Sequence, residues 1–411
     1  MAIIRPFQAV RPRADLASRI AALPYDVYNR QEAKKEVERE AESFLQIDRA
    51  ETMCAENVDT YAPEVYQKAH DLLWEKIENG IFIQDKKPYY YLYELVMNGR
   101  SQTGIVACAS IDDYLDNVIK KHESTRAEKE QDRICHVDVC KAQTGPIFLA
   151  YRKNEKLKAL IEETKKKKPE FDFQAEDGVM HRGWKIEEED KATQIEKIFG
   201  DMKEIYIADG HHRAASAVKV GLKRREEHPG YTGKEEFNFF LSVLFSDEEL
   251  YIMDYNRAVR DLNGYTEEQF LDKIKEKFSI TLQEKMVKPQ KKGQIGMNLK
   301  GKWYLLECKA QYKDKDPVEG LDVSYLQREL LCPVLGIEDP KTDERISFIG
   351  GIRGIAELER RVKEDCAVAF AMYPTTMEEL FAVADEGRLM PPKSTWFEPK
   401  LRSGLFLHLI G

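Results

Sequence analysis

The residues of this chain best suited to chemistry form the run 209–213, Asp-Gly-His-His-Arg. An apolar stretch precedes this run and an Ala-rich stretch follows it, which indicates a strand, a tight turn and the start of a helix. Such a turn points several backbone N–H groups into one concavity, and the helix dipole there favours an anion. Arg213 adds a planar donor for phosphate oxygens. The run therefore predicts a phosphate site.

Two other interpretations of this run stay open. The turn is purely structural if Asp209 caps the helix while both histidines pack or face solvent. His211 and His212 could instead hold a metal ion, although adjacent side chains face different ways and the sequence identifies no third ligand.

A second candidate is the charged run 120–126, after which further charged residues extend to His136. Glu123 is flanked there by His122 and several cations. A carboxylate in such a setting can take the proton of a hydroxyl nucleophile, while the cations offset charge on a transferring phosphoryl group. The competing interpretation is an exposed helix or loop laced with salt bridges.

The elements that must position these residues alternate between strand and helix. Residues 1–85 open with a proline-punctuated segment and then favour helix. Two β-type runs, 89–96 and 103–111, flank the hairpin dipeptide Asn98-Gly99. A sheet therefore begins in this part of the chain.

Further strands are expected over 204–208 and 237–245, and a helix from residue 213. A helix-start pattern at Thr266 opens another section in which helices and strands alternate, so the simplest domain cut lies near residue 260. The expected fold class is α/β or α+β.

Composition narrows the classes of function. The sequence is 42% hydrophobic and 33% charged, which is typical of globular proteins. Its length of 411 residues is enough for two or three domains. A net charge of −9 disfavours nucleic acid as the main partner. The sequence shows neither an apolar run of about 18 residues nor a secretory signal, so we expect a cytoplasmic protein without a membrane partner.

Established metal and nucleotide signatures are missing from the sequence. The seven cysteines are scattered, and Cys135 and Cys140 lack a second pair at zinc-ligand spacing. Neither the P-loop pattern, nor the dinucleotide-binding glycine fingerprint, nor the hydrolase nucleophile elbow occurs. Any use of a nucleotide must therefore depend on another phosphate cradle.

The 209–213 run resembles the phosphate-binding motif of the ParB/sulfiredoxin superfamily, in the form carried by its free serine kinases. Lys121-His122-Glu123 is similar to the segment that provides the catalytic glutamate of those kinases. Nearly the whole chain also resembles a prokaryotic family of unassigned function that contains this domain. The segments that carry this wider resemblance are 23–27, 121–125, 209–213, 392–395 and 399–400.

The resemblance implies a central ParB/sulfiredoxin-like nucleotide-binding domain at 86–260, between a mostly helical region at 1–85 and a C-terminal α+β domain at 261–411. It implies a phosphotransferase that uses ADP or ATP with Mg²⁺ and a small hydroxyl substrate. Free L-serine and O-phosphoserine are the favoured pair. The alternative is a non-catalytic nucleotide-binding regulatory or scaffold protein of the same superfamily.

The resemblance also implies roles for individual residues. Glu123 would deprotonate the substrate hydroxyl, and Asp209 would act near the phosphates or as a Mg²⁺ ligand. This mechanism requires the two residues to meet in space despite the long segment between them. Phosphate contacts would come from Gly210, His211, His212 and Arg213, and further substrate or phosphate contacts from His122, Thr125 and Arg126.

Overall fold

The computed structural model describes residues 1–310 and 315–411, which divide into two compact units. The first unit comprises Met1–Lys121, Thr125–Leu250 and Pro399–Gly411, and the second comprises His122–Ser124 and Tyr251–Glu398. The predicted boundaries at 85 and 260 differ from this division. One reason is that strands from both ends of the chain pair with the central segment, as described below.

A mixed sheet of nine strands, counted over the described residues, forms the centre of the first unit. Its order is β6-β11-β8-β12-β5-β4-β10-β9, and β1 pairs with β5. The strands predicted near 89, 103, 204 and 237 are confirmed as β4, β5, β11 and β12. The bounds are β1 (Ile4–Arg5), β4 (Tyr90–Met97), β5 (Arg100–Ser110), β6 (Ile119–Lys120), β8 (Ile147–Tyr151), β9 (Phe171–Gln174), β10 (Met180–Ile186), β11 (Ile205–Asp209) and β12 (Phe239–Ser246).

Two short antiparallel pairs join distant parts of the chain to this unit. Strand β2 (Val10–Pro12) pairs with β3 (Phe82–Gln84), and β7 (Ala142–Gln143) pairs with β21 (His408–Leu409). The second pair brings the last residues of the chain back to the first unit. A fold cut at residue 260 would separate them.

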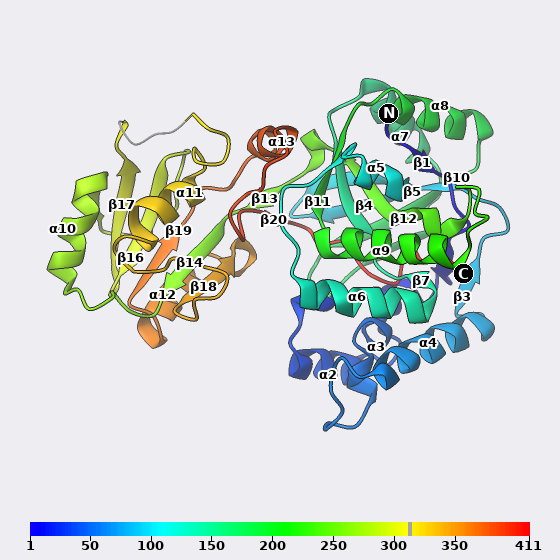
Figure 1. The fold of residues 1–411 in the computed structure, drawn as a ribbon, viewed down its shortest axis with the longest axis horizontal. Helices are drawn as coiled ribbons and strands as arrows, with labels where there is room; N and C mark the ends of the chain where they lie inside the picture. Colours follow the sequence, from blue (N-terminus) through cyan, green and yellow to red (C-terminus); the bar gives the residue numbers. More distant parts are fainter. Residues whose placement is uncertain (311–314) are drawn as a thin grey trace. The chain divides into compact units, whose positions relative to one another are not determined.

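Three helices of the first unit form a stack beside the sheet, in which α9 packs on α6, and α6 packs on α4 (Figure 1). The α-helices are α1 (Ala17–Ile20), α2 (Arg30–Arg39), α3 (Leu45–Asp48), α4 (Pro63–Glu78), α5 (Ile111–Leu115), α6 (Ala127–Cys140), α7 (Glu155–Thr164), α8 (Glu189–Gly200) and α9 (His211–Glu227). The 3-10 turns are η1 (Tyr25–Val27), η2 (Ala50–Met53), η3 (Glu236–Asn238) and η4 (Asp247–Glu249).

Two large apolar clusters stand out among the described residues of the first unit. One lies where sheet residues such as Leu92 and Ile105 meet Phe199 of α8 and Val218 of α9. The other gathers the apolar faces of the N-terminal helices around Phe44. Burial of these faces is the main stabilising contribution to such a stack, because isolated helices of this length are marginal in water.

The second unit contains a six-stranded sheet among the described residues, in the order β15-β17-β16-β19-β14-β18, and a short pair of β13 with β20. Its strands are β13 (Ile252–Met253), β14 (Tyr255–Val259), β15 (Phe278–Gln283), β16 (Gln294–Leu299), β17 (Lys302–Cys308), β18 (Ile346–Gly350), β19 (Val368–Ala371) and β20 (Trp396–Phe397). Its helical segments are α10 (Glu267–Lys277), α11 (Asp322–Leu326), η6 (Gln327–Leu331), η7 (Gly351–Arg353), α12 (Ala356–Glu364) and α13 (Met377–Asp385).

The helix start predicted at Thr266 is confirmed at α10. The Thr266 hydroxyl accepts the N–H of Gln269, whose side chain accepts the N–H of Thr266 in return. This reciprocal capping fixes the first turn. The α+β fold class expected from the sequence is confirmed, and none of the helices in the described part of the chain combines the length and hydropathy that crossing a membrane requires.

Candidate functional site

The turn at Gly210 connects β11 to α9. Its backbone is left-handed, with φ of 94° and ψ of 33°, a conformation that L side chains rarely adopt. An added Cβ would also lie 3.1 Å from the guanidinium of Arg213. The N-cap of α9 is Gly210, which has no side chain, in contrast to the interpretation in which Asp209 is the cap. The positive end of the helix dipole therefore faces the turn.

Asp209, the last residue of β11, makes two contacts through its carboxylate. Oδ1 accepts the N–H of Gly210 at 2.8 Å, and Oδ2 pairs with Nζ of Lys400 at 2.9 Å. Burial by itself would raise the pKa of Asp209, but the attraction of Lys400 and Arg213 outweighs it and holds that pKa well below its usual range. The carboxylate is therefore ionised at neutral pH.

Arg213 lies in the first turn of α9, as predicted, and its side chain reaches the connection between β7 and β8. Nη1 donates to the carbonyl oxygen of Pro146 at 2.6 Å. Among the described residues, no carboxylate lies within ion-pair distance of this guanidinium. A cation held by a carbonyl keeps its full charge for an anionic ligand.

The segment that carries Glu123 is anchored beside this turn at both of its ends. Before it, β6 pairs in parallel with β11, with Lys120 opposite Tyr206. After it, the N–H of Arg126 donates to Nε2 of His212 at 2.9 Å. Only a few residues connect these two points, so the segment has to pass close to the turn at Gly210.

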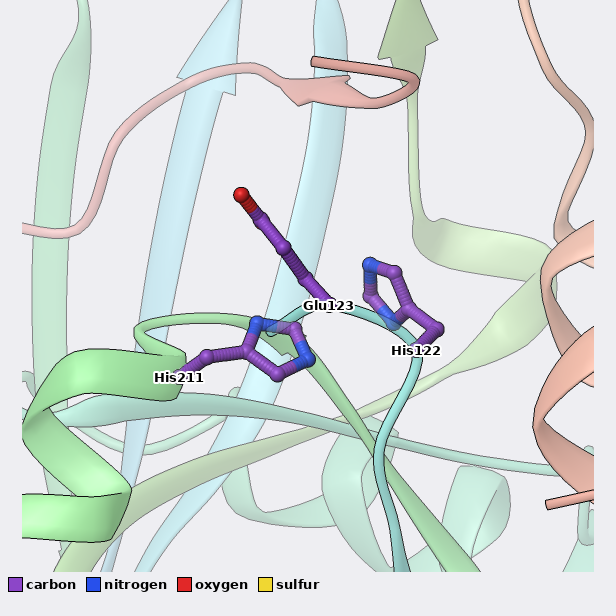
Figure 2. A group of neighbouring side chains, drawn as sticks. All are labelled: His122, Glu123 and His211. Carbon is purple, nitrogen blue, oxygen red and sulfur yellow. The ribbon is translucent and has the colours of Figure 1, made fainter. Parts of the chain in front are cut away.

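Three titratable side chains, His122, Glu123 and His211, are drawn together in Figure 2. One ligand atom from each lies within 4.8 Å of the others. Two imidazole nitrogens and a carboxylate oxygen are a donor set that suits zinc and other transition metals, and the same groups can accept and release protons. The sequence alone identified no third metal ligand beside the two adjacent histidines, because His122 and Glu123 lie far earlier in the chain.

The remaining predicted contacts organise the start of α6. The Thr125 hydroxyl donates to the Glu130 carboxylate at 2.7 Å, and Glu130 also pairs with Lys219 of α9. Arg126 has an exposed side chain, and its backbone N–H holds His212. His212 is therefore turned toward α6, as expected for two adjacent histidines that face different ways.

A cavity of about 270 Å³ beside α6, with many charged residues in its lining, adds residues such as Asp48 and Arg49 that the sequence did not single out. A second, of about 30 Å³, adjoins it and reaches Arg213. Both are lined by residues of the first unit, and four residues line the two together: Tyr25, Asp48, Arg133 and His136.

The α6 residues of these cavities lie within the charged run that one interpretation placed on an exposed surface. That interpretation is wrong for Asp132, Arg133 and His136, which are 8%, 6% and 3% exposed. Nε and Nη2 of Arg133 bind Asp132, and the guanidinium carbon lies 4.0 Å from the centre of the Tyr25 ring. Burial lowers the pKa of His136, with Arg133 adding to the effect, and Nε2 of His136 donates to the Ile47 carbonyl.

The comparisons with known proteins give a family for this chain. Residues 4–324 match the family model described as "Protein of unknown function (DUF1015)", and the chain belongs to that family. This confirms the predicted membership of a family of unassigned function. A comparison with curated proteins finds no match.

Several solved structures are similar to this chain at low identity. They include a free serine kinase variant in complex with ADP (14% identity, TM-score 0.36, 74% of this chain and 92% of the other covered). SbnI from Staphylococcus aureus with a C-terminal truncation has 10% identity and a TM-score of 0.40, covering 74% and 87%. A conserved hypothetical protein from Pyrococcus furiosus has 15% identity and a TM-score of 0.37, covering 74% and 95%. With TM-scores below 0.5, these structures do not decide the chemistry of this chain.

Proposed function

We propose that this protein is a nucleotide-dependent phosphotransferase that acts on a small hydroxyl compound, with free L-serine and O-phosphoserine as the favoured pair. The observation that carries the proposal is the proximity of Glu123 to His211, the first residue of α9. A carboxylate that can act as a base then lies beside a turn that can hold phosphate. The proposal includes the ParB/sulfiredoxin-like character of residues 86–260.

The turn at Gly210 suits the phosphates of ADP or ATP. Its left-handed glycine lets the backbone approach a ligand closely, and the N-terminal end of α9 offers its dipole. Arg213 and Lys400 supply two cations near Asp209. Gly210, His211 and Arg213 are the proposed phosphate contacts, whereas Nε2 of His212 already accepts the N–H of Arg126.

Glu123 is the proposed general base. The substrate hydroxyl oxygen forms a bond to the terminal phosphorus of the nucleotide, and the bond from that phosphorus to the bridging oxygen breaks. The shortened nucleotide leaves with the electron pair, and the hydroxyl proton passes to the Glu123 carboxylate. His122, Thr125 and Arg126 are the proposed further contacts to substrate or phosphate.

Asp209 is the residue proposed to hold Mg²⁺ together with the nucleotide. Mg²⁺ prefers oxygen ligands, which the ionised Asp209 carboxylate offers once Lys400 turns toward the phosphates. When bound, the ion would offset negative charge on the phosphates. The group formed by His122, Glu123 and His211 offers two nitrogens and one oxygen and suits Mg²⁺ less well.

The test is direct. Purified full-length protein is incubated with Mg²⁺, L-serine and either ADP or ATP, and O-phosphoserine is measured by ³¹P NMR and mass spectrometry. We expect product with one of the two nucleotides. No product with either nucleotide, from serine or from a panel of other hydroxyl amino acids, would overturn the proposal. Nucleotide binding without any product would favour the regulatory or scaffold class.

A further inference from the structure

The face of α6 that lines the larger cavity is built against the usual pattern of a packed helix. Lys129, Asp132, Arg133 and His136 follow one another at helical spacing on one face, and the last three are buried. A helix that packs on its neighbours normally turns an apolar stripe inward. Buried charges are costly even when they are paired, so packing does not explain this face.

Most of the charged groups around the cavity satisfy one another. Arg49 binds Glu51 and the carbonyl oxygens of Tyr25 and Tyr28. The two carboxylate oxygens of Asp132 accept from Tyr66 and from Arg133. These groups hold the walls of the cavity in place.

Two side chains of opposite charge, Arg133 and Asp48, each have one polar atom that makes no hydrogen bond within the described residues, 1–310 and 315–411. Nη1 of Arg133 makes no hydrogen bond there, because Nε and Nη2 alone reach Asp132. Asp48 is 4% exposed and accepts from the Thr144 hydroxyl through Oδ1 at 2.7 Å, while its Oδ2 makes no hydrogen bond there. Both residues line both cavities, so a cationic donor and an anionic acceptor face the same space.

We infer that this cavity binds a small zwitterion of the α-amino acid class, with its carboxylate on Arg133 and its ammonium group on Asp48. A ligand with both charges satisfies both open positions, whereas a ligand with one charge leaves the other position without a hydrogen bond. The walls from η1, η2 and α4 belong to the N-terminal region, so this region takes part in recognition.

The place of the cavity also assigns the ligand a role, which rests on the proposed function. The smaller cavity extends from Tyr25 and Arg133 to Arg213 at the start of α9. A zwitterion bound on Arg133 and Asp48 can therefore point its side chain toward the proposed phosphate turn. In this role the cavity selects the phosphoryl acceptor.

The binding test uses isothermal titration calorimetry of the full chain without nucleotide. Four ligands are compared. L-Serine and L-alanine carry both charges, ethanolamine carries only the ammonium group, and glycolate carries only the carboxylate. We expect L-serine and L-alanine to bind, and each single-charge ligand to bind at least about tenfold more weakly. No binding of either amino acid to the folded protein would overturn the inference.

Two substitutions separate the two charges. Asp48→Asn keeps the shape and the acceptor for Thr144, and we expect it to weaken L-serine and ethanolamine at least about tenfold while glycolate is unchanged. Arg133→Lys keeps the positive charge near Asp132 but loses the planar donor, and we expect it to weaken L-serine and glycolate while ethanolamine is unchanged. The matched control is Asp138→Asn, an acid of α6 that does not line the cavity and pairs with Lys223 and Arg224 instead.

The outcomes of this test and of the activity test are distinct. If both amino acids bind in the expected pattern but no phosphoserine forms, the cavity assignment stands and the proposed reaction fails. If phosphoserine forms while Asp48→Asn and Arg133→Lys, shown to be folded by circular dichroism, keep the wild-type KM for serine, the cavity assignment fails and the reaction stands.

Discussion

Helix α9 buries a face of small and apolar residues, whereas the neighbouring helix α6 buries charged and titratable ones. The buried residues of α9 after its first turn are Ala214, Ala215, Ser216, Ala217, Val218, Val220 and Gly221. Those of α6 are Glu130, Asp132, Arg133, His136 and Cys140. The two helices pack against each other, so the comparison concerns adjacent elements of one unit.

The difference shows two ways of using a helix. In α9 the buried face packs against neighbouring elements, and a ligand could bind only at the N-terminal end, near Gly210 and Arg213. In α6 the face itself lines a cavity, and packing is left to other residues such as Ile134 and Val137. Substitutions on the packed face of α9 should therefore change stability, and substitutions on the cavity face of α6 should change binding.

The largest effect is expected just before α6. Glu123→Gln keeps the shape of the side chain but removes the proposed base, so turnover should fall by about 10²–10⁴-fold while nucleotide affinity is nearly unchanged. Single-turnover kinetics and nucleotide titration measure the two quantities. Glu189→Gln, an exposed acid in the first turn of α8, is the matched control. Wild-type turnover in a folded Glu123→Gln protein would remove this residue from the chemistry, and Asp26 or Glu128 would be the next candidate bases.

The N-terminal end of α9 is tested by Arg213→Ala. Loss of a charged hydrogen bond to phosphate should weaken nucleotide binding by about 1.5–3 kcal/mol. Because Arg213 also donates to Pro146, thermal unfolding is measured alongside the nucleotide Kd. The control is Arg224→Ala. Arg224 lies in the last turn of α9 and pairs with Asp138 of α6, so its loss should leave the nucleotide Kd unchanged. If Arg213→Ala and the wild type bind the nucleotide with equal affinity, the Arg213 side chain does not contact phosphate.

The packing face of α9 is tested by Gly221→Ala. An added Cβ would lie 2.4 Å from the carbonyl oxygen of Phe237 and 2.8 Å from Cδ1 of Ile111. The backbone has to shift, and we expect the free energy of unfolding to fall by about 1–3 kcal/mol without a change in nucleotide Kd. Urea unfolding measures the loss. Gly200→Ala at the end of α8, where nothing lies within 4 Å, is the control and should be nearly neutral.

The smallest effect concerns the ion pair of Asp209 and Lys400 that precedes α9. Because the folded state lowers the pKa of Asp209, the pair stabilises the fold above the unfolded pKa of 3.8, and this contribution is lost as the pH falls below that value. Lys400→Met should therefore reduce the unfolding free energy at about pH 7 by about 0.2–1 kcal/mol, and by less at about pH 3. An equal loss at both pH values would show that the pair acts by packing alone.

The strand, turn and helix around Gly210 could be predicted from the sequence because the signals are local. An apolar run gives β11, glycine permits the left-handed turn, and an Ala-rich run gives α9. The same holds for the hairpin at Asn98-Gly99 between β4 and β5, which is confirmed. Local chemistry therefore gives the position of the proposed phosphate turn within a residue or two.

The cavity beside α6 could not be predicted in the same way. A run that contains Asp132, Arg133 and His136 has the composition of an exposed surface, and its burial depends on Asp48 and Tyr25 from a distant part of the chain. One signal was present in the sequence. These residues recur at helical spacing, which places them on a single face.

The pairing of Asp209 with Lys400 has a consequence for how the protein is made. The chain of the second unit, about 150 residues from Tyr251 to Glu398, is synthesised before Lys400, which at typical rates takes roughly 10–30 s. During that interval the nascent first unit has β11 and α9 but neither the counter-ion of Asp209 nor β21. The proposed phosphate turn therefore gains the counter-ion of Asp209 only after the whole segment Tyr251–Glu398 has been synthesised.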